Sequence, residues 1–232
     1  MDIKNKTALV TGAGRGIGRA IALALAKEGA NLMLAARSKK ELDSVADEVR
    51  ALGVKAAVMP TDMRDEKQVR AMVPAAVKEF GALHILINNA GLGYFKPAAD
   101  LTTSEWDEMF SVNLRGIFIA TQAAIPHLRS AKESFVINIA SLAGKNTFSG
   151  GSGYAATKWG LRAFSQCLML EERQYGIRVL AVCPGSVDTS FSTHSAKKDI
   201  IHSEDVADTI IMALRMPQRS MVSEIDIRPT NP

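Results

Sequence analysis

A tyrosine and a lysine four residues apart are the pair in this sequence best suited to moving a proton. Tyr154 and Lys158 have the i, i+4 spacing that places two side chains on one face of a helix, a spacing that ordinary surface pairs also have. Ser141 ends an apolar strand pattern, and Asn113 lies in the long helical pattern before it, so both are expected at the same sheet edge. Together these groups could deliver a proton to a carbonyl oxygen.

The acidity of the phenol decides whether this chemistry is accessible. Free tyrosine has a pKa near 10, too high for easy proton exchange at neutral pH. An ammonium about 4 Å away contributes roughly 4 kcal/mol at an effective dielectric of 20, or about three pKa units before desolvation. A helix amino end near Tyr154 acts in the same direction. We therefore expect a lowered pKa for Tyr154, as general acid in carbonyl reduction and general base in alcohol oxidation.

A glycine-rich segment follows the first apolar strand pattern and opens a helical one. It reads Thr11-Gly12-Ala13-Gly14-Arg15-Gly16-Ile17-Gly18, with the spacing Thr-Gly-x-x-x-Gly-x-Gly rather than G-x-G-x-x-G. Glycines permit a sharp turn and let phosphate oxygens approach the N–H groups at the positive end of a helix. A turn that merely packs strand against helix is the alternative, but the strand before and the helix after favour a dinucleotide phosphate site.

The end of the second strand pattern indicates which nicotinamide cofactor such a site would accept. A carboxylate at this place would hold the ribose 2′-hydroxyl of NAD, but the segment reads Ala35-Ala36-Arg37-Ser38-Lys39. Arg37, together with Arg15, could clamp a 2′-phosphate, for which a guanidinium is well suited. The alternative is that both arginines are solvated surface charges. The sequence therefore predicts NADP(H) rather than NAD(H).

Short apolar runs alternate with longer amphipathic ones along the whole chain. The runs predict strands at Thr7–Thr11, Asn31–Ala36, Lys55–Met59, Ile85–Asn89, Ser134–Ala140, Arg178–Cys183 and Glu224–Arg228. Helices are predicted at Gly16–Glu28, Lys39–Leu52, Glu66–Phe80, Thr103–Leu128, Tyr154–Tyr175 and Ser203–Arg215, several with polar capping residues such as Ser38, Asp65, Thr103 and Ser203. This alternation predicts an α/β, Rossmann-type, doubly wound, seven-stranded parallel sheet with helices on both faces, as one domain over residues 1–232.

Composition excludes several other classes of protein. Apolar residues make up 47% and charged residues 22% of the 232, which is typical of a globular domain with a sizeable core. The net charge of +4 is spread along the chain, so it gives little support to nucleic-acid binding. No run is long enough for a membrane span, and no signal peptide precedes the first strand. Two cysteines and four scattered histidines indicate neither a disulfide scaffold nor a metal site, so we expect a cytoplasmic protein without metal.

These motifs resemble the short-chain dehydrogenase/reductase family in its compact single-domain form, and the chain is similar to 3-oxoacyl-carrier-protein reductase-like members. The matching landmarks occur in family order over nearly the whole chain. They are Thr11-Gly12-x-x-x-Gly16-Ile17-Gly18, Asp62, Asn88-Asn89-Ala90-Gly91, Asn113, Ser141, Tyr154-x-x-x-Lys158, and Pro184-Gly185 followed by Thr189.

The resemblance implies a role for each landmark. Lys158 would also hold the nicotinamide ribose, Ser141 would hydrogen-bond the substrate oxygen, and Asn113 would support a proton-relay water. Asp62 would meet the adenine amino group, and Asn89 to Gly91 would line the adenosine ribose. The expected NADP(H) contacts are Thr11, Gly12, Gly14, Arg15, Gly16, Ile17, Gly18, Arg37, Ser38, Asp62, Met63, Asn89, Ala90, Gly91, Tyr154, Lys158, Pro184, Gly185, Val187 and Thr189.

The substrate is expected to be a small carbonyl compound or the corresponding alcohol. The expected substrate contacts are Ser141, Tyr154, Leu92, Tyr94, Leu142, Phe148 and Phe191, with Gly144 nearby. The segment from Pro184 to His202 is a candidate lid, which is short beside those of many relatives. The chain ends without the Asn-Gly-Gly turn common in ketoacyl reductases. A 3-oxoacyl thioester, a 3-hydroxy acid and a non-catalytic NADP-binding redox sensor therefore remain alternatives.

The long fourth helix predicts self-association. Its apolar residues cover more than one face, and only one of those faces can lie on the sheet: Trp106, Met109, Phe110, Leu114, Ile117 and Phe118. In the resembling family this helix and the tyrosine-bearing helix pair across a two-fold axis. We expect a homodimer or homotetramer, with no nucleic-acid or membrane partner.

Overall fold

The fold is built on a single parallel sheet. The computed structural model describes residues 1–189, 191 and 200–230. Its seven strands lie in the order β3-β2-β1-β4-β5-β6-β7, and every neighbouring pair is parallel. The strands are β1 (Thr7–Thr11), β2 (Asn31–Ala36), β3 (Ala56–Pro60), β4 (Ile85–Asn88), β5 (Ser134–Ile139), β6 (Ile177–Pro184) and β7 (Glu224–Ile227). The predicted fold class is confirmed, and each predicted strand end lies within one residue of the observed one.

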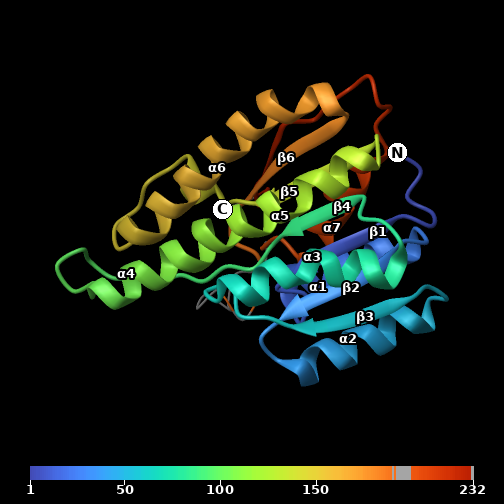
Figure 1. The fold of residues 1–232 in the computed structure, drawn as a ribbon. Coiled ribbons are helices and arrows are strands. Elements are labelled where there is room, and N and C mark those ends of the chain that lie inside the picture. Colours follow the sequence, from blue (N-terminus) through green and yellow to red (C-terminus); the bar gives the residue numbers. More distant parts are fainter. Residues whose placement is uncertain (190, 192–199, 231–232) are drawn as a thin grey trace.

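Helices cover both faces of the sheet (Figure 1). They are α1 (Gly16–Lys27), α2 (Lys39–Ala51), α3 (Glu66–Phe80), α4 (Thr103–Phe110), α5 (Gly116–Ser130), α6 (Ser152–Glu172) and α7 (Ser203–Arg215). Short turns of other helix types are η1 (Ser111–Arg115) between α4 and α5, η2 (Leu142–Gly144) after β5, and η3 (Arg173–Tyr175) after α6. The candidate active-site residues lie at the helix ends that follow the carboxyl ends of the strands.

Alternation along the strands explains the two layers. In β1, Ala8 and Val10 belong to the core shared with α1, α2 and α7, whereas Leu9 belongs to the core shared with α3 and α5. All three side chains are fully buried. A strand covered on both faces needs apolar residues in succession, which is why these segments have no polar alternation.

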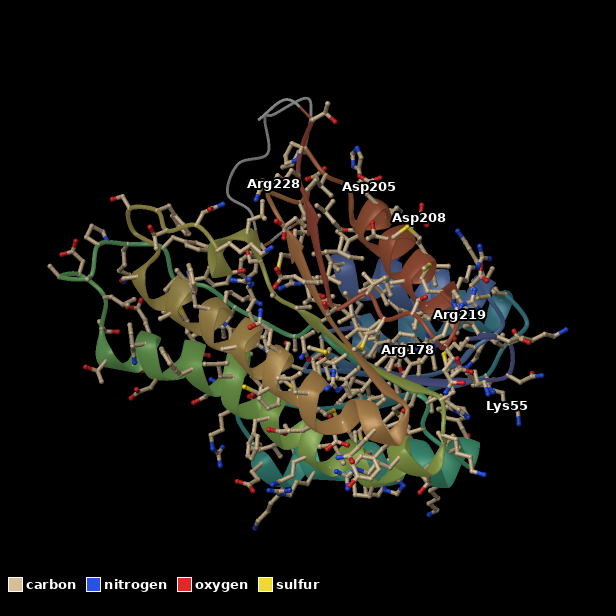
Figure 2. The ribbon with its side chains drawn as sticks, turned by 90° about the horizontal axis from the view of Figure 1, so that it is seen from above. Lys55, Arg178, Asp205, Asp208, Arg219 and Arg228 are labelled. Carbon is tan, nitrogen blue, oxygen red and sulfur yellow. The ribbon has the colours of Figure 1, made fainter. Side chains whose placement is uncertain are left out.

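The strand order reverses between β1 and β4, because the chain crosses from the β3 edge back to the middle of the sheet. In an open α/β sheet, ligands bind beyond the carboxyl ends of the strands near such a reversal. Figure 2 shows the two ends of the sheet: Arg178 lies near the start of β6, and Arg228 lies just past the end of β7. The candidate site belongs to the end marked by Arg228.

The long helix predicted over 103–128 is interrupted, so that prediction is wrong in detail. α4 ends at Phe110, the π-helical turn η1 covers Ser111–Arg115, and α5 continues to Ser130. π-turns inside α-helices occur frequently at functional sites, and this one carries Asn113. Residue periodicity is almost the same on both sides of the turn, so the pattern alone does not reveal it.

Two of the predicted helix caps also need correction. Ser38 and Asp65 do cap helices, but the caps expected at Thr103 and Ser203 lie one residue earlier, at Thr102 and His202. In both places an acidic residue three positions after the cap binds the cap's backbone N–H, which fixes the boundary.

The Thr11 hydroxyl joins the first strand to the fourth at the reversal point. It donates to the Ile87 carbonyl at 3.2 Å and accepts from the N–H groups of Asn89 and Ala90 at 3.0 and 3.1 Å. Thr11 is fully buried, so no solvent can replace these bonds. The hydroxyl therefore fixes the position of the backbone after β4 relative to the glycine turn after β1.

Thr11→Val should destabilise the protein more than Thr11→Ser does. Valine keeps the shape but leaves two backbone N–H groups without an acceptor, at a cost of about 2–4 kcal/mol. Serine keeps the hydroxyl and loses one buried methyl, at about 1 kcal/mol. Urea unfolding of both variants measures the difference, and equal losses would show that the hydroxyl does not hold this junction.

Candidate active site

The glycine turn after β1 packs so closely that side chains are excluded. Gly12 has a φ of +64°, and a Cβ added there would lie 2.8 Å from Asn89 Nδ2 and 2.9 Å from Ala90 Cα. A Cβ on Gly18 would collide with the Gly12 carbonyl oxygen. The Asn89 amide holds the turn in place by donating to the Thr11 and Gly12 carbonyls at 3.0 and 3.2 Å. The backbone and the start of α1 are thus arranged as a dinucleotide phosphate site requires.

Asn89 has a structural role that the resemblance did not supply. Its amide nitrogen is committed to the glycine turn, which leaves its carbonyl oxygen and Ala90 as the parts that could face a ribose. The alternative view of this segment, a turn stabilised by side-chain amides, is therefore part of the structure. Neighbouring Asn88 is fully buried and donates to Thr121 and Asn138.

Charged groups surround the place where an adenosine 2′-phosphate would lie. Arg37 is exposed just past β2, and Arg15 is an exposed residue of the glycine turn, 3.8 Å from Glu41. The Glu41 side chain also lies close to Gly14, where an added Cβ would be 3.0 Å from its Oε2. The Ser38 hydroxyl caps α2 by accepting from the Glu41 N–H, so its acceptor capacity is partly used. The sequence did not indicate Glu41 as part of this region.

Asp62 is held by an arginine that sequence reasoning missed. Arg64 binds its carboxylate through Nε at 3.0 Å and through Nη2 at 2.5 Å, and this contact holds the pKa of Asp62 below its usual range. Arg64 also reaches Glu108 of α4 at 2.9 Å, and Glu108 accepts from the Tyr94 hydroxyl at 2.5 Å. Met63 is buried, with its backbone oxygen close to Gly116 at the start of α5.

Tyr154 lies in the first turn of α6, and Lys158 follows one turn later on the same face. Tyr154 is 9% exposed and Lys158 is 4% exposed. The Lys158 ammonium donates to the Ile139 carbonyl, the last residue of β5, at 2.8 Å. It lies 5.6 Å from the centre of the Tyr154 ring. The spacing prediction of a shared face is confirmed.

The expected acidification of the phenol is wrong for the protein alone. Burial raises the pKa of Tyr154 to about 12, and the neighbouring Ser141 hydroxyl only partly opposes this. Burial also lowers the pKa of Lys158 to about 8. The physical reason is that desolvation outweighs the attraction between the two groups, since the ammonium turns to the end of β5. At neutral pH the phenol is protonated and the amine is mostly charged.

Asn113 fixes the geometry beside this pair. Its amide donates to the Leu92 carbonyl at 2.8 Å and to the Thr157 hydroxyl at 3.0 Å, and it accepts from the Leu92 N–H at 2.9 Å. The π-turn thereby joins the loop after β4 to α6. An added Cβ on Gly91 would lie 3.4 Å from Asn113 Oδ1 and 3.7 Å from Lys158 Nζ, so these groups meet around Gly91.

Ser141 follows β5 and begins the short turn η2. Its hydroxyl accepts from the Ala143 N–H at 3.1 Å and lies 3.5 Å from the Pro184 carbonyl at the end of β6. An ionic cluster holds this turn against β7: Lys145 pairs with Glu224 and Asp226, each at 2.5 Å, and Arg162 pairs with Glu224 at 2.8 Å. Arg162 also donates to the Gly144 carbonyl at 2.6 Å.

The structure brings together some expected substrate residues and separates others. Phe191 lies near Tyr154, 5.7 Å from it between ring centres, whereas Phe148 packs against Phe95. Phe95, which sequence reasoning missed, contacts all three rings. Tyr94 instead binds Glu108, and Leu92 contributes its backbone to Asn113. Leu142 packs against the segment after β6, where an added Cβ on Gly185 would lie 3.2 Å from it.

The segment after β6 returns toward the glycine turn. Thr189 lies next to Gly16, where an added Cβ would be 3.3 Å from its methyl group, and its hydroxyl accepts from the Phe191 N–H at 3.3 Å. Val187 forms a bridge with Ile201, so the two ends of this segment are joined. Residues 190 and 192–199, including His194 and the middle of the expected lid, lie outside the described residues.

Two other features of the described residues bear on function. Within them, no cluster of histidine, cysteine or acidic side chains has the arrangement of a metal site, and no helix is long and apolar enough to span a membrane. Cys183 is buried near the end of β6 and Cys167 is exposed; the helical pattern around Cys167 predicts a core position, and that prediction is wrong.

Lys158→Met should stabilise the protein while removing the ammonium from the site. The unfolded chain keeps this amine charged up to about pH 10.5, whereas the folded chain loses the proton near 8, so folding at pH 7 must bury a charge. We expect the variant to be more stable by about 1–3 kcal/mol at pH 7, an advantage that shrinks as the pH rises from 8 to 10.5. Urea unfolding at pH 7 and pH 10 measures this.

The exposed Lys78 supplies the control for this experiment, because Lys78→Met removes a lysine that is already solvated. Its effect on the free energy of unfolding should be small and should not change with pH. A Lys158→Met variant that is less stable at both pH values would contradict the assignment of a desolvated ammonium.

Comparison with known proteins places the whole chain in one family. The model of the short chain dehydrogenase family matches residues 6–200. An uncharacterized oxidoreductase of Staphylococcus aureus (strain USA300) is 36% identical over 229 residues, which is 98% of each chain. A short chain dehydrogenase from Burkholderia cenocepacia, solved in complex with NADP, superposes with a TM-score of 0.92 at 32% identity over 99% of this chain and 98% of that one.

A 3-ketoacyl-ACP reductase from Sinorhizobium meliloti superposes with a TM-score of 0.89 at 36% identity over 96% of this chain and 97% of that one. The matches to these relatives extend over nearly the full length, and the glycine turn and the tyrosine–lysine helix lie within the matched family region. The chain belongs to the short-chain dehydrogenase family.

Proposed function

We propose that this protein is an NADP(H)-dependent oxidoreductase that reduces a ketone or aldehyde, or oxidises the corresponding alcohol, in one domain that carries both the cofactor and the substrate residues. The observation that carries the proposal is the buried Tyr154 phenol, with the Ser141 hydroxyl beside it and the Lys158 ammonium behind its ring. Family membership and the NADP found in the Burkholderia cenocepacia structure support it.

The raised pKa of Tyr154 keeps the phenol protonated at pH 7, as the direction of reduction requires, but makes release of the proton harder than from a free tyrosine. A general acid must hold its proton until the transition state, and a phenol with a pKa of about 12 is fully protonated at pH 7. When the carbonyl oxygen takes this proton, the resulting phenolate is stabilised by the Lys158 ammonium in a site with little water. The Ser141 hydroxyl donates to the same carbonyl oxygen and so opposes charge build-up there.

The bound nicotinamide supplies the hydride for reduction and accepts it in oxidation. The residues proposed to hold the cofactor extend across the carboxyl ends of β1, β2, β4 and β6. The glycine turn would bind its phosphates, Arg37 and Arg15 its 2′-phosphate, Asp62 its adenine and Thr189 its nicotinamide end.

The alternative of a redox sensor is not favoured. A sensor needs no proton donor, yet Tyr154, Lys158 and Ser141 are all present and brought together at the end of β5. The likeness to the Sinorhizobium meliloti protein supports a 3-oxoacyl thioester as one ketone to test.

We also propose that the protein forms a homo-oligomer. An apolar groove on α4, η1, α5 and α6 is lined by Asp107, Phe110, Ser111, Leu114, Arg115, Phe118 and Phe164. Trp106, Phe118 and Trp159 remain exposed around it, while Met109 and Ile117 of the same helices are buried in the core. A second copy packing on this face would bury the exposed rings.

Tyr154→Phe should lower kcat for ketone reduction by about 10²–10⁴, the usual contribution of a positioned general acid. The phenylalanine ring keeps its contacts with Phe95 and Phe191, so the fold and the Kd for NADPH should not change. Steady-state kinetics and NADPH fluorescence titration measure the two quantities. Turnover within threefold of the wild type would contradict the role of the phenol.

Arg37→Asp should reverse the preference between the two nicotinamide cofactors. The change removes a cation beside the 2′-phosphate and adds a carboxylate that can accept from a 2′-hydroxyl. We expect the ratio of kcat/KM with NADPH to that with NADH to fall by at least about 100-fold, corresponding to roughly 2.7 kcal/mol. Lys40→Asp, an equal charge change at an exposed residue of α2, is the control and should leave the ratio nearly unchanged.

A further inference from the structure

Two half-exposed phenylalanine rings, Phe95 and Phe191, lie beside the proposed proton donor, and a third, Phe148, packs against Phe95. Phe95, Phe148 and Phe191, here called the aromatic wall, have 47%, 47% and 42% of their surface exposed. Tyr154, which Phe95 and Phe191 adjoin, is 9% exposed. Large apolar side chains that stay exposed at one place mark a binding surface more often than chance exposure does. A substrate at the Tyr154 hydroxyl therefore has this wall as its neighbour.

Phe95 is the centre of the aromatic wall. Its ring centre lies 5.2 Å from that of Tyr154, 5.9 Å from that of Phe191 and 6.1 Å from that of Phe148. The first two pairs are edge-to-face, with interplanar angles of 68° and 82°. These are the distances and angles at which aromatic quadrupoles attract each other.

The wall is assembled from three separate segments of the chain. Phe95 follows β4, Phe148 lies between η2 and α6, and Phe191 follows β6. Glycines make the close approach possible: a Cβ added to Gly93 would lie 2.7 Å from the Phe95 ring, 3.0 Å from Tyr154 and 3.2 Å from Phe191. Phe148 packs just as closely over Gly151. The rings are therefore positioned by the backbone and not only by mutual attraction.

Two lysines near the wall in the described part of the chain have ion-pair partners. Lys96 pairs with Glu105 at 2.7 Å, and Lys145 pairs with Glu224 and Asp226. The Tyr94 hydroxyl donates to the Glu108 carboxylate. A substrate carboxylate that bound either lysine would need these ion pairs to break.

Building on the proposed function, we propose that the preferred substrates are ketones and aldehydes that carry an aryl group on a short spacer, with the aryl ring packed against Phe95, Phe148 and Phe191. In the reaction the carbonyl carbon accepts a hydride from NADPH, which becomes NADP⁺, and the carbonyl oxygen accepts the proton of Tyr154. The product is the secondary or primary alcohol.

Ring geometry and apolar area predict opposite preferences. A cyclohexyl group has more apolar surface than a phenyl group, so area alone favours the cyclohexyl substrate. A phenyl group has a quadrupole and can add edge-to-face pairs with the exposed ring faces. A preference for phenyl over cyclohexyl is therefore specific to the arrangement of the wall.

The test compares 4-phenyl-2-butanone with 4-cyclohexyl-2-butanone. Two methylene groups insulate each carbonyl, so intrinsic reactivity is matched and only the distal ring differs. With NADPH, we expect the wild type to show a kcat/KM about five- to tenfold higher for the phenyl ketone. In Phe95→Leu, which removes all three ring pairs of Phe95, the ratio should fall to about one or below.

Two further variants separate the wall from general effects on folding. Phe148→Leu removes one ring pair and should lower the ratio by a smaller factor than Phe95→Leu. Tyr175→Leu changes an aromatic residue of similar exposure in η3, beyond the far end of α6, and should leave the ratio as in the wild type.

The outcomes distinguish this inference from the proposed function. Reduction of both ketones at equal kcat/KM, a preference for the cyclohexyl ketone, or an unchanged ratio in Phe95→Leu would overturn the aromatic wall and leave the oxidoreductase assignment intact. A preference for 3-hydroxy acids or acyl thioesters over both ketones would do the same. If neither ketone is reduced, calorimetry with the two corresponding alcohols decides: tighter binding of the phenyl alcohol that is lost in Phe95→Leu supports the wall, and equal binding overturns it.

Discussion

Removal of water from the Tyr154 phenol and the Lys158 amine acts on the two groups in opposite ways, and the rest of the site depends on this. Burial raises the pKa of the phenol to about 12 and lowers that of the amine to about 8. Burial favours the neutral form of each group. The phenol therefore stays protonated, and the neighbouring ammonium is destabilised relative to the neutral amine. The low polarity of the buried site also strengthens the stabilisation of a phenolate by the ammonium, because Coulomb attraction is screened little there.

The carboxyl end of β5 supports this pair. The Lys158 ammonium is tied to the last residue of β5, and α6 carries both side chains along the buried face. Asn113 connects the loop after β4 to α6, and the Thr11 hydroxyl connects that loop to the glycine turn. Cofactor and substrate residues are thereby positioned by a continuous set of hydrogen bonds that runs across the carboxyl ends of β1, β4 and β5.

Sequence patterns predict the frame well because most strands are apolar on both faces and are followed closely by glycine or polar residues. The β1–α1 region shows why: Thr11 to Gly18 contains both the turn and the phosphate-binding backbone in consecutive residues. The π-turn at Asn113 was not predictable, because one inserted residue hardly alters helical periodicity. Phe95 was missed since nothing local distinguishes a ring that packs on Tyr154, 59 positions away, from an ordinary loop residue.

The pKa of Tyr154 was mispredicted from the sequence for a different reason. Residue types and spacing give the sign of the attraction between an ammonium and a phenol, but burial depends on the loops that close over both. Likewise, the approach of Arg15 to Glu41 depends on how α2 lies beside the glycine turn. Such contacts come from tertiary packing, so they are known only once the fold is.

Titration of the tyrosines by ¹³C NMR, with the carbon that bears the hydroxyl labelled, tests the central claim most directly. Three tyrosines are present, and Tyr154→Phe assigns the relevant signal. The Tyr154 signal of the protein without cofactor should stay that of a neutral phenol up to at least pH 10, as a pKa of about 12 requires. A phenolate signal from Tyr154 between pH 7 and 8 would show that attraction by Lys158 outweighs desolvation, and would contradict the account.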